Sequence, residues 1–187
     1  LRCGVTTSVD AGSAGWRSFP AFKSQTIDRS ITRVLGFLNI VGEGMRGPPL
    51  EQDNADMSSE AAAAFAGDNR EHVLGFKVAH YLKPDWVPID NAITAGNSAQ
   101  LPVMIDFGRS GLSLEELTMH RLRPGDIYTH VFGGGIEGRE SIVDPDTGRL
   151  RPFVKAAKAR GIVWDVGHGS LSFFLKTAIA AAREGFF

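Results

Sequence analysis

Short apolar segments alternate with helix-like segments along the chain, and this alternation restricts the fold more than any other feature. The run from Val34 to Val41 is continuously apolar, which is typical of a strand buried on both faces. We predict six strands, at residues 5–9, 34–41, 73–79, 101–107, 126–132 and 161–166. Helices are predicted at 22–32, from Ser58 or Ser59 onward, at 89–99, from Ser113 onward, at 152–159 and at 171–183. Such an alternation predicts a parallel sheet covered by helices.

Two architectures accommodate this pattern: a doubly wound open sheet and a (β/α) TIM-type barrel. A complete barrel has eight strands and typically about 250 residues. The 187 residues with six predicted strands therefore fit one partial barrel domain over residues 1–187, with about six of the eight strand–helix units. The chain starts at Leu1 rather than at an initiator Met, and we expect it to be a fragment of a longer polypeptide.

The composition excludes several classes of protein. Hydrophobic residues make up 43% and charged residues 22% of the chain, which is the composition of a globular protein. The formal net charge of −1 argues against a nucleic-acid-binding surface spread over the molecule. A single Cys excludes an internal disulfide and a Cys-rich zinc site. No apolar run reaches the ~18 residues of a membrane span, and no signal peptide is visible, so we expect a cytoplasmic protein that does not bind membranes.

Polar residues stand at the carboxyl ends of the predicted strands, where parallel α/β proteins place their chemistry. Lys77 is unusual among them because a lysine within an apolar strand is costly to bury as a cation. A neutral lysine amine can react with carbon dioxide to form a carbamate, which is an anionic ligand with two oxygens. The alternative is a strand-end lysine whose ammonium group reaches solvent. The other strand-end residues are Asp10, Asn39, Asp106, His130, Asp165 and His168.

Several short motifs, taken in order, resemble the metal-dependent amidohydrolase superfamily, and within it the dihydroorotase-like amidohydrolase/deacetylase group. The resemblance extends over nearly the whole chain, and its specificity lies in the combination. The motifs are Gly4-Val-Thr-Thr-Ser-Val-Asp-Ala-Gly-Ser-Ala-Gly15, Gly75-Phe-Lys-Val78, Leu101-Pro-Val-Met104, Leu122-Arg-Pro-Gly-Asp126, Thr129-His130 and Asp165-Val-Gly-His-Gly169.

The resemblance implies a (β/α)8 barrel with one or two divalent metal ions, zinc first and manganese as the second candidate. Lys77 matches the carboxylated lysine ligand of the family, and His130 matches the histidine on its sixth strand. Asp106 stands where the family has a histidine ligand, either as an oxygen ligand or as the mark of a divergent subgroup. Asp165 and His168 are the candidate substrate-binding residues, with ordinary loop hydrogen bonds as the alternative. The family's His-x-His motif does not occur in this sequence, and no residue is assigned as the catalytic base.

We therefore predict a metal-dependent hydrolase that cleaves the C–N bond of a small-molecule amide, cyclic or N-acyl, or an acyl ester. We expect this activity to be impaired in the chain as it stands, and we expect an incomplete barrel to self-associate through its open edges. One alternative is a fragment without catalytic activity. Another is a nucleotide-binding α/β protein, suggested only by the G-x-G-x-x-G pattern at residues 133–138, which is read here as a flexible loop.

Overall fold

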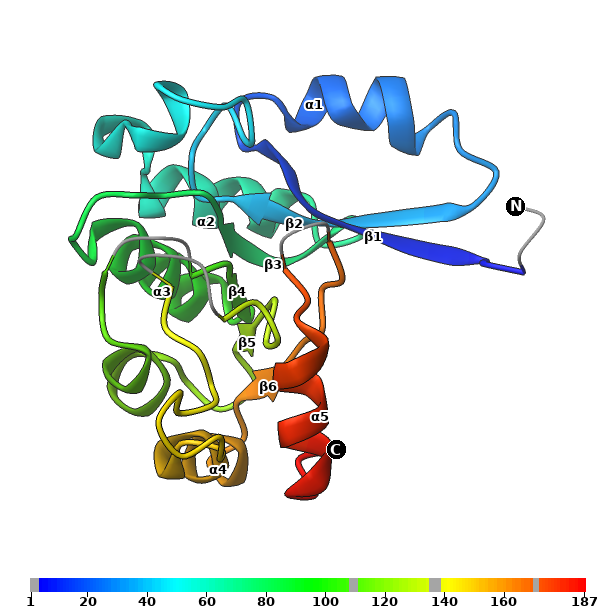
Figure 1. Ribbon diagram of the computed structural model, residues 1–187. Coiled ribbons are helices and arrows are strands. Elements are labelled where there is room, and N and C mark those ends of the chain that lie inside the picture. The colour runs from blue at the N-terminus through cyan, green and yellow to red at the C-terminus, as the bar shows by residue number, and fades with distance from the viewer. Residues whose placement is uncertain (1–3, 108–110, 135–138, 170–171) are drawn as a thin grey trace. The chain divides into compact units, whose positions relative to one another are not determined.

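The computed structural model describes residues 4–107, 111–134, 139–169 and 172–187, which form two compact units (Figure 1). Unit 1 comprises Leu1–Tyr81 and Trp86–Met104, and unit 2 comprises Leu82–Asp85 and Ile105–Phe187. Unit 1 contains β1 (Thr7–Gly15), α1 (Phe19–Phe22), η1 (Lys23–Ile27), β2 (Arg33–Asn39), η2 (Leu50–Gln52), η3 (Asn54–Asp56), α2 (Ser59–Asp68), β3 (Val73–Val78) and α3 (Val87–Ala99). β4 (Val103–Ile105) runs from unit 1 into unit 2, which contains η4 (Glu116–Arg121), β5 (Ile127–Tyr128), α4 (Pro152–Ala159), β6 (Val163–Trp164) and α5 (Leu175–Arg183).

The hydrogen-bonded order of the strands is the chain order, from β1 to β6. The pairs β1–β2, β2–β3 and β5–β6 are parallel. A doubly wound sheet reverses its strand order at a switch point, and this order has no reversal. The structure thus confirms the predicted α/β class and favours the incomplete TIM-type barrel over the doubly wound sheet. The prediction of one domain over residues 1–187 stays a prediction.

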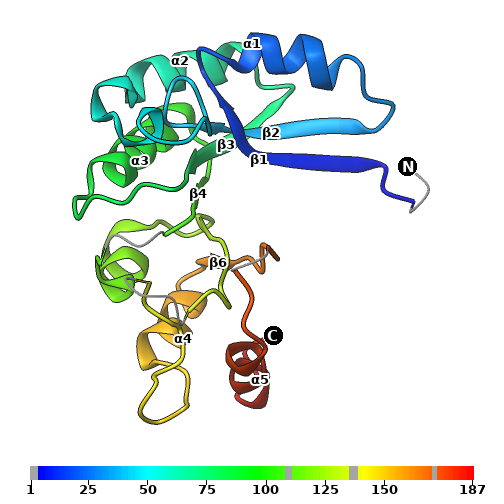
Figure 2. The ribbon, with the colours of Figure 1, turned by 45° about the horizontal axis from the view of Figure 1, so that its top comes forward.

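In unit 1, the helices cover the strands through aromatic and small residues. Phe19 of α1 is 1% exposed, and its ring packs over Gly36 of β2. The same ring lies 5.5 Å, between centroids, from the ring of Phe65 in α2, while α2 also packs against α3 (Figure 2). The N-cap of α2 is Ser58, whose hydroxyl accepts a hydrogen bond from the Ala61 amide at 3.2 Å, as one of the two predicted caps requires. This packing holds β1, β2 and β3 in a fixed register.

Two predicted boundaries in unit 1 are wrong. The first strand continues to Gly15 instead of ending at residue 9, because it pairs with β2 through Ala11 and again, after a register shift, at the Gly15–Asn39 partners. Glycine permits this extension where the chains crowd, since a Cβ on Gly15 would lie 1.8 Å from the Val41 carbonyl oxygen. The first helical segment covers residues 19–27 rather than 22–32, and it starts with Pro20 in its first turn.

In unit 2, the assigned strands are shorter than predicted, but their hydrogen bonds continue beyond them. The amide of Thr129 donates to the Ile105 carbonyl at 3.1 Å, and the amide of Val131 donates to the Asp165 carbonyl at 3.1 Å. α4 has the predicted bounds, whereas α5 begins at Leu175, and residues 170 and 171 lie outside the described residues. Hydrogen bonding between neighbouring strands therefore continues beyond the assigned ends of β4, β5 and β6, toward the polar residues that follow each strand.

An antiparallel bridge between Val143 and Leu150 closes the turn that follows Val143. Among the helices that the structure describes, none is long and apolar enough to cross a membrane.

Candidate functional site

His130 is held in one orientation by the backbone of the chain segment after β6. Its Nδ1 atom makes a short hydrogen bond with the Gly167 carbonyl oxygen. A carbonyl oxygen only accepts, so Nδ1 must carry the proton and donate it. This leaves Nε2 as the ring nitrogen available for a ligand, and it lies 3.5 Å from Oδ2 of Asp106. The backbone of His130 has a φ of 62°, a left-handed conformation that is strained for a residue with a side chain.

Asp106 follows β4 and is a buried carboxylate, 8% exposed. Its Oδ2 atom faces His130, and its Oδ1 atom lies 3.5 Å from Nη1 of Arg139. The guanidinium of Arg139 is itself buried, with a side chain that is 8% exposed. Asp106 therefore lies between a histidine ring and an arginine, and its charge is partly compensated inside the protein.

Arg139 also contacts the end of β5. Its Nη2 atom lies 3.4 Å from the carbonyl oxygens of both Thr129 and His130. Its charge lies near the hydroxyl of Tyr128, a residue of β5 that is 1% exposed. Burial raises the pKa of that hydroxyl, and the nearby Arg139 charge opposes the rise. Tyr128 therefore remains protonated at neutral pH.

Asp165 and Gly167 complete the surroundings of His130. The Thr129 hydroxyl donates to Oδ2 of Asp165 at 2.5 Å. A Cβ on Gly167 would lie 2.3 Å from Thr129 Oγ1 and 2.7 Å from His130 Nδ1. Only glycine fits at position 167, because any side chain would push apart the groups that orient the imidazole. Asp165 is thus occupied by a structural hydrogen bond, and its predicted role in substrate binding stays a prediction.

His168 is exposed and differs from His130 in its surroundings. Its ring lies 5.0 Å, between centroids, from the ring of Phe173, at an interplanar angle of 41°. The predicted role of His168 in substrate binding stays a prediction.

Lys77 belongs to unit 1, at the end of β3, and is 3% exposed. Its Cα partner in β2 is Asn39, whose amide group donates to the Gly12 carbonyl at 3.1 Å. A Cβ on Gly12 would lie 2.6 Å from Cγ of Lys77, so the lysine stem packs directly against the glycine backbone. The structure thus confirms that Lys77 is buried rather than reaching out to solvent.

The residues of unit 2 fit a metal ion in two respects. A histidine ligand commonly donates its second ring nitrogen to a carbonyl or carboxylate, as His130 does to Gly167. Two ligands on one tetrahedral zinc ion lie about 3.4 Å apart, from metal–ligand distances of about 2.1 Å, and Nε2 of His130 lies 3.5 Å from Oδ2 of Asp106. Within residues 4–107, 111–134, 139–169 and 172–187, no group of three or more His, Cys, Asp or Glu side chains converges on one point. The predicted ligand roles of His130, Asp106 and Lys77 stay predictions.

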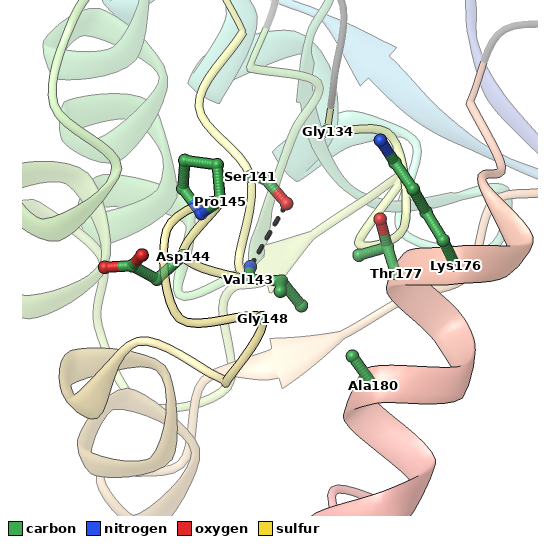
Figure 3. A pocket seen from close by; sticks show the side chains of 9 residues that line it. All are labelled: Gly134, Ser141, Val143, Asp144, Pro145, Gly148, Lys176, Thr177 and Ala180. Atoms are coloured by element: carbon green, nitrogen blue, oxygen red, sulfur yellow. Dashed lines mark hydrogen bonds between the residues drawn. The ribbon is translucent and has the colours of Figure 1, made fainter.

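A pocket of about 260 Å³ lies elsewhere in unit 2, between α5 and the turn at residues 141–148 (Figure 3). Its polar groups are largely engaged locally. The Ser141 hydroxyl accepts from the Val143 amide at 3.1 Å, and the Asp144 carboxylate accepts from the amides of Asp146 and Thr147. None of the predicted site residues lines it; those that do are Gly134, Ser141, Val143, Asp144, Pro145, Gly148, Lys176, Thr177 and Ala180.

A dinucleotide site requires a helix that starts directly at the glycine pattern, which here spans residues 133–138. Gly133 and Gly134 lie in irregular backbone, and residues 135–138 lie outside the described residues. The next helix in the described part of the chain is α4, which begins at Pro152. Gly133 instead leaves room for the Arg139 guanidinium, because a Cβ at that position would lie 3.0 Å from Cζ of Arg139.

Sequence reasoning missed Arg139, which stands in a loop with no recognisable pattern around it. It also gave no role to Gly12 or Thr129, although both stand in motifs that carry the family resemblance. Their roles follow from close approaches between segments far apart in the chain, which no local pattern records.

No protein-family model matches the chain. A deacetylase from Agrobacterium fabrum is 33% identical to it in an alignment of 190 positions that covers 97% of this chain and 45% of that protein. A solved structure of an adenine deaminase superposes with a TM-score of 0.87 at 28% identity, covering 97% of this chain and 50% of that one. A dihydroorotase structure superposes with a TM-score of 0.80 at 30% identity, covering 97% and 57%.

These similarities extend over nearly all of the sequence, and the chain spans about half the length of the curated relative. The relatives agree with one another, since deacetylase, adenine deaminase and dihydroorotase are all amidohydrolase-type enzymes. With its strands paired in chain order, this chain resembles amidohydrolase-superfamily enzymes over nearly its whole length and fits a dihydroorotase-like amidohydrolase group.

Proposed function

We propose that the chain is part of a metal-dependent hydrolase that cleaves a C–N bond of a small-molecule amide, either cyclic or N-acyl. An acyl ester is the alternative substrate. The observation that carries the proposal is the orientation of His130, whose Nδ1 is bound by the Gly167 carbonyl while Nε2 and Asp106 Oδ2 lie 3.5 Å apart. That pair offers two ligand atoms at the spacing of one coordination sphere. The relatives named deacetylase, adenine deaminase and dihydroorotase support C–N hydrolysis.

In this proposal, His130 and Asp106 are metal ligands in unit 2, Lys77 is a metal ligand in unit 1, and the metal is one or two ions of zinc or manganese. Lys77 is buried in an otherwise apolar strand, where a carbamate formed by addition of carbon dioxide to the neutral amine, with loss of a proton, turns the side chain into an oxygen ligand. A divalent ion, when bound, polarises the substrate carbonyl and lowers the pKa of water. Gly167 fixes the His130 tautomer, and Thr129 fixes Asp165, so that both side chains keep one orientation during the reaction.

The test is metal analysis combined with hydrolysis assays on N-acetylated amino acids, cyclic amides and acyl esters. We expect the 187-residue chain to bind zinc weakly and to hydrolyse little, because it spans about half of its relatives. A longer protein with segments on both sides is expected to bind the metal tightly and to be active. In that protein Lys77→Ala is expected to abolish activity, whereas Lys23→Ala, which removes a half-buried lysine of unit 1 paired with Asp28, is expected to leave it intact.

An active longer protein that keeps its rate after Lys77→Ala would contradict the role of Lys77. Absence of zinc and manganese from both the short and the long protein would contradict the metal dependence. Tight, stoichiometric zinc in the 187-residue chain would contradict its proposed impairment.

We also propose that the isolated chain self-associates. β1 stands at the end of the strand order, and its residues Thr7 to Val9 are exposed, with Val9 46% exposed. An exposed strand edge with apolar side chains is a template for pairing with a second chain. Light scattering that shows a stable monomer would contradict this.

A further inference from the structure

Arg139 is fixed beside Asp106 by several contacts at once. Its side chain is 8% exposed, its Nη1 lies 3.5 Å from Asp106 Oδ1, and its Nη2 lies 3.4 Å from the carbonyl oxygens of Thr129 and His130. Gly133 leaves room for the guanidinium, since a Cβ at that position would lie 3.0 Å from Cζ of Arg139. A buried arginine held in this way cannot swing into solvent without leaving Asp106 without its charge partner.

The position of this cation matters because Asp106 uses its two oxygen atoms in different directions. Oδ1 faces the guanidinium, and Oδ2 faces Nε2 of His130. A divalent cation bound by Oδ2 and Nε2 would share one carboxylate with a permanent positive charge. At short range inside a protein, two positive charges repel strongly, and the shared carboxylate compensates only one of them.

We propose that Arg139 is a positioning residue that competes with the metal ion for Asp106. It holds the carboxylate with Oδ2 turned toward His130, and its charge weakens the binding of a divalent ion there. The inference rests on the proposed function, since it assumes that His130 and Asp106 bind a metal. The inference gives a role to Arg139, which no sequence pattern indicated. It predicts that His130 and Asp106 bind a metal ion more weakly than they would without the Arg139 guanidinium.

The experiment measures zinc and manganese affinity of the 187-residue chain by competition with a chromophoric chelator, so the readout is independent of activity. Arg139→Gln removes the charge and keeps an amide donor for the Thr129 and His130 carbonyls. We expect it to bind metal at least about tenfold more tightly than the unaltered chain, a conservative value for removing a charge at such range. Arg139→Lys keeps the charge and is expected to remain within about threefold of the unaltered chain.

Two further variants keep the comparison decisive. Arg139→Met is a second neutral variant that retains the aliphatic stem, for use if the glutamine variant fails to fold by circular dichroism. Arg149→Gln removes the same charge from a side chain of unit 2 that is 77% exposed, and it is expected to leave the affinity unchanged.

The outcomes separate the two proposals. Metal bound by the unaltered chain, with equal or weaker affinity in the neutral Arg139 variants, overturns the role of Arg139 and leaves the metal proposal standing. If Arg149→Gln raises the metal affinity as much as Arg139→Gln does, the role of Arg139 is also overturned, because the change in net charge alone would then explain the effect. Absence of metal from every variant of the 187-residue chain overturns this inference, whereas the metal proposal falls only if the longer protein also lacks zinc and manganese.

Discussion

Gly12 lies directly against the buried stem of Lys77: a Cβ on Gly12 would come within 2.6 Å of Cγ and 2.7 Å of Cβ of the lysine. Gly12 also has a φ of 98°, which favours glycine. Glycine is therefore required at position 12 for two reasons: it adopts this backbone conformation, and it leaves the space that the Lys77 side chain fills.

Gly12→Ala is expected to lower the free energy of unfolding by about 2–4 kcal/mol, combining backbone strain with a clash against Lys77. Urea denaturation measures the loss. Gly47→Ala is the matched control, because Gly47 has a φ of 79° with nothing within 4 Å of the added Cβ. Equal losses in the two variants would show that Lys77 is not crowded by Gly12.

Gly167→Ala is expected to displace His130, because the added Cβ would lie 2.7 Å from His130 Nδ1 and 2.3 Å from Thr129 Oγ1. Loss of such support for a ligand typically costs 10–100-fold in metal affinity, so we expect a fall of about that size for zinc. Gly148→Ala provides the control, since Gly148 has a φ of 68° and open space around it. An unchanged zinc affinity in Gly167→Ala would argue against a ligand role for His130.

Asp106→Asn is expected to destabilise the chain by about 3 kcal/mol, because it leaves the buried Arg139 guanidinium without its counter-ion. The double variant Asp106→Asn/Arg139→Gln is expected to recover part of the loss, with a coupling energy of at least about 1 kcal/mol in a double-mutant cycle. Urea denaturation of the metal-free protein supplies all four values.

The control cycle uses Lys23 and Asp28, an ion pair of 2.7 Å whose side chains are 33% and 49% exposed. Exposed pairs contribute little, so we expect a coupling below about 1 kcal/mol there despite the shorter distance. A larger coupling for Lys23 and Asp28 than for Asp106 and Arg139 would refute the importance of burial at Arg139.

Glu184 is expected to make the stability of unit 2 dependent on acid pH. The Lys155 ammonium donates to its carboxylate at 2.7 Å and the Leu150 amide at 2.9 Å, and these bonds lower the pKa of Glu184 below its ordinary value of 4.5. A lowered pKa in the folded state stabilises the protein above the unfolded-state pKa, and this contribution is lost as the pH falls through the folded-state value.

Glu184→Gln is therefore expected to lower the urea midpoint at pH 7 and to flatten its decline on acidification to about pH 3, relative to the unaltered chain. Glu115→Gln, at an exposed position of unit 2, is expected to leave both midpoints unchanged. Parallel declines for the unaltered chain and Glu184→Gln would show that the Lys155 pair does not form in solution.

The alternation of apolar runs and helix signals was sufficient to predict the class of fold. A strand that is buried on both faces has no polar side, so it appears in the sequence as a continuous apolar run. The alternation also placed α4 correctly, since Pro152 can only begin a helix there and the apolar period continues to Ala159. The apolar runs also placed Lys77, Asp106 and His130 at or just after the carboxyl ends of strands. The strand ends themselves were predicted less well, because glycines such as Gly15 let β1 continue where composition suggested a loop.

Tertiary structure alone decided how these residues are supported. The Gly167 carbonyl selects the His130 tautomer, the Thr129 hydroxyl binds Asp165, and the charge of Arg139 lies against Asp106. Each of these contacts joins segments that are separated along the chain, and each depends on a few tenths of an ångström of space. Local pattern reflects burial and backbone preference over a few residues, whereas the tautomer of a ring and the partner of a buried charge are set by whichever distant groups the fold brings within hydrogen-bonding distance.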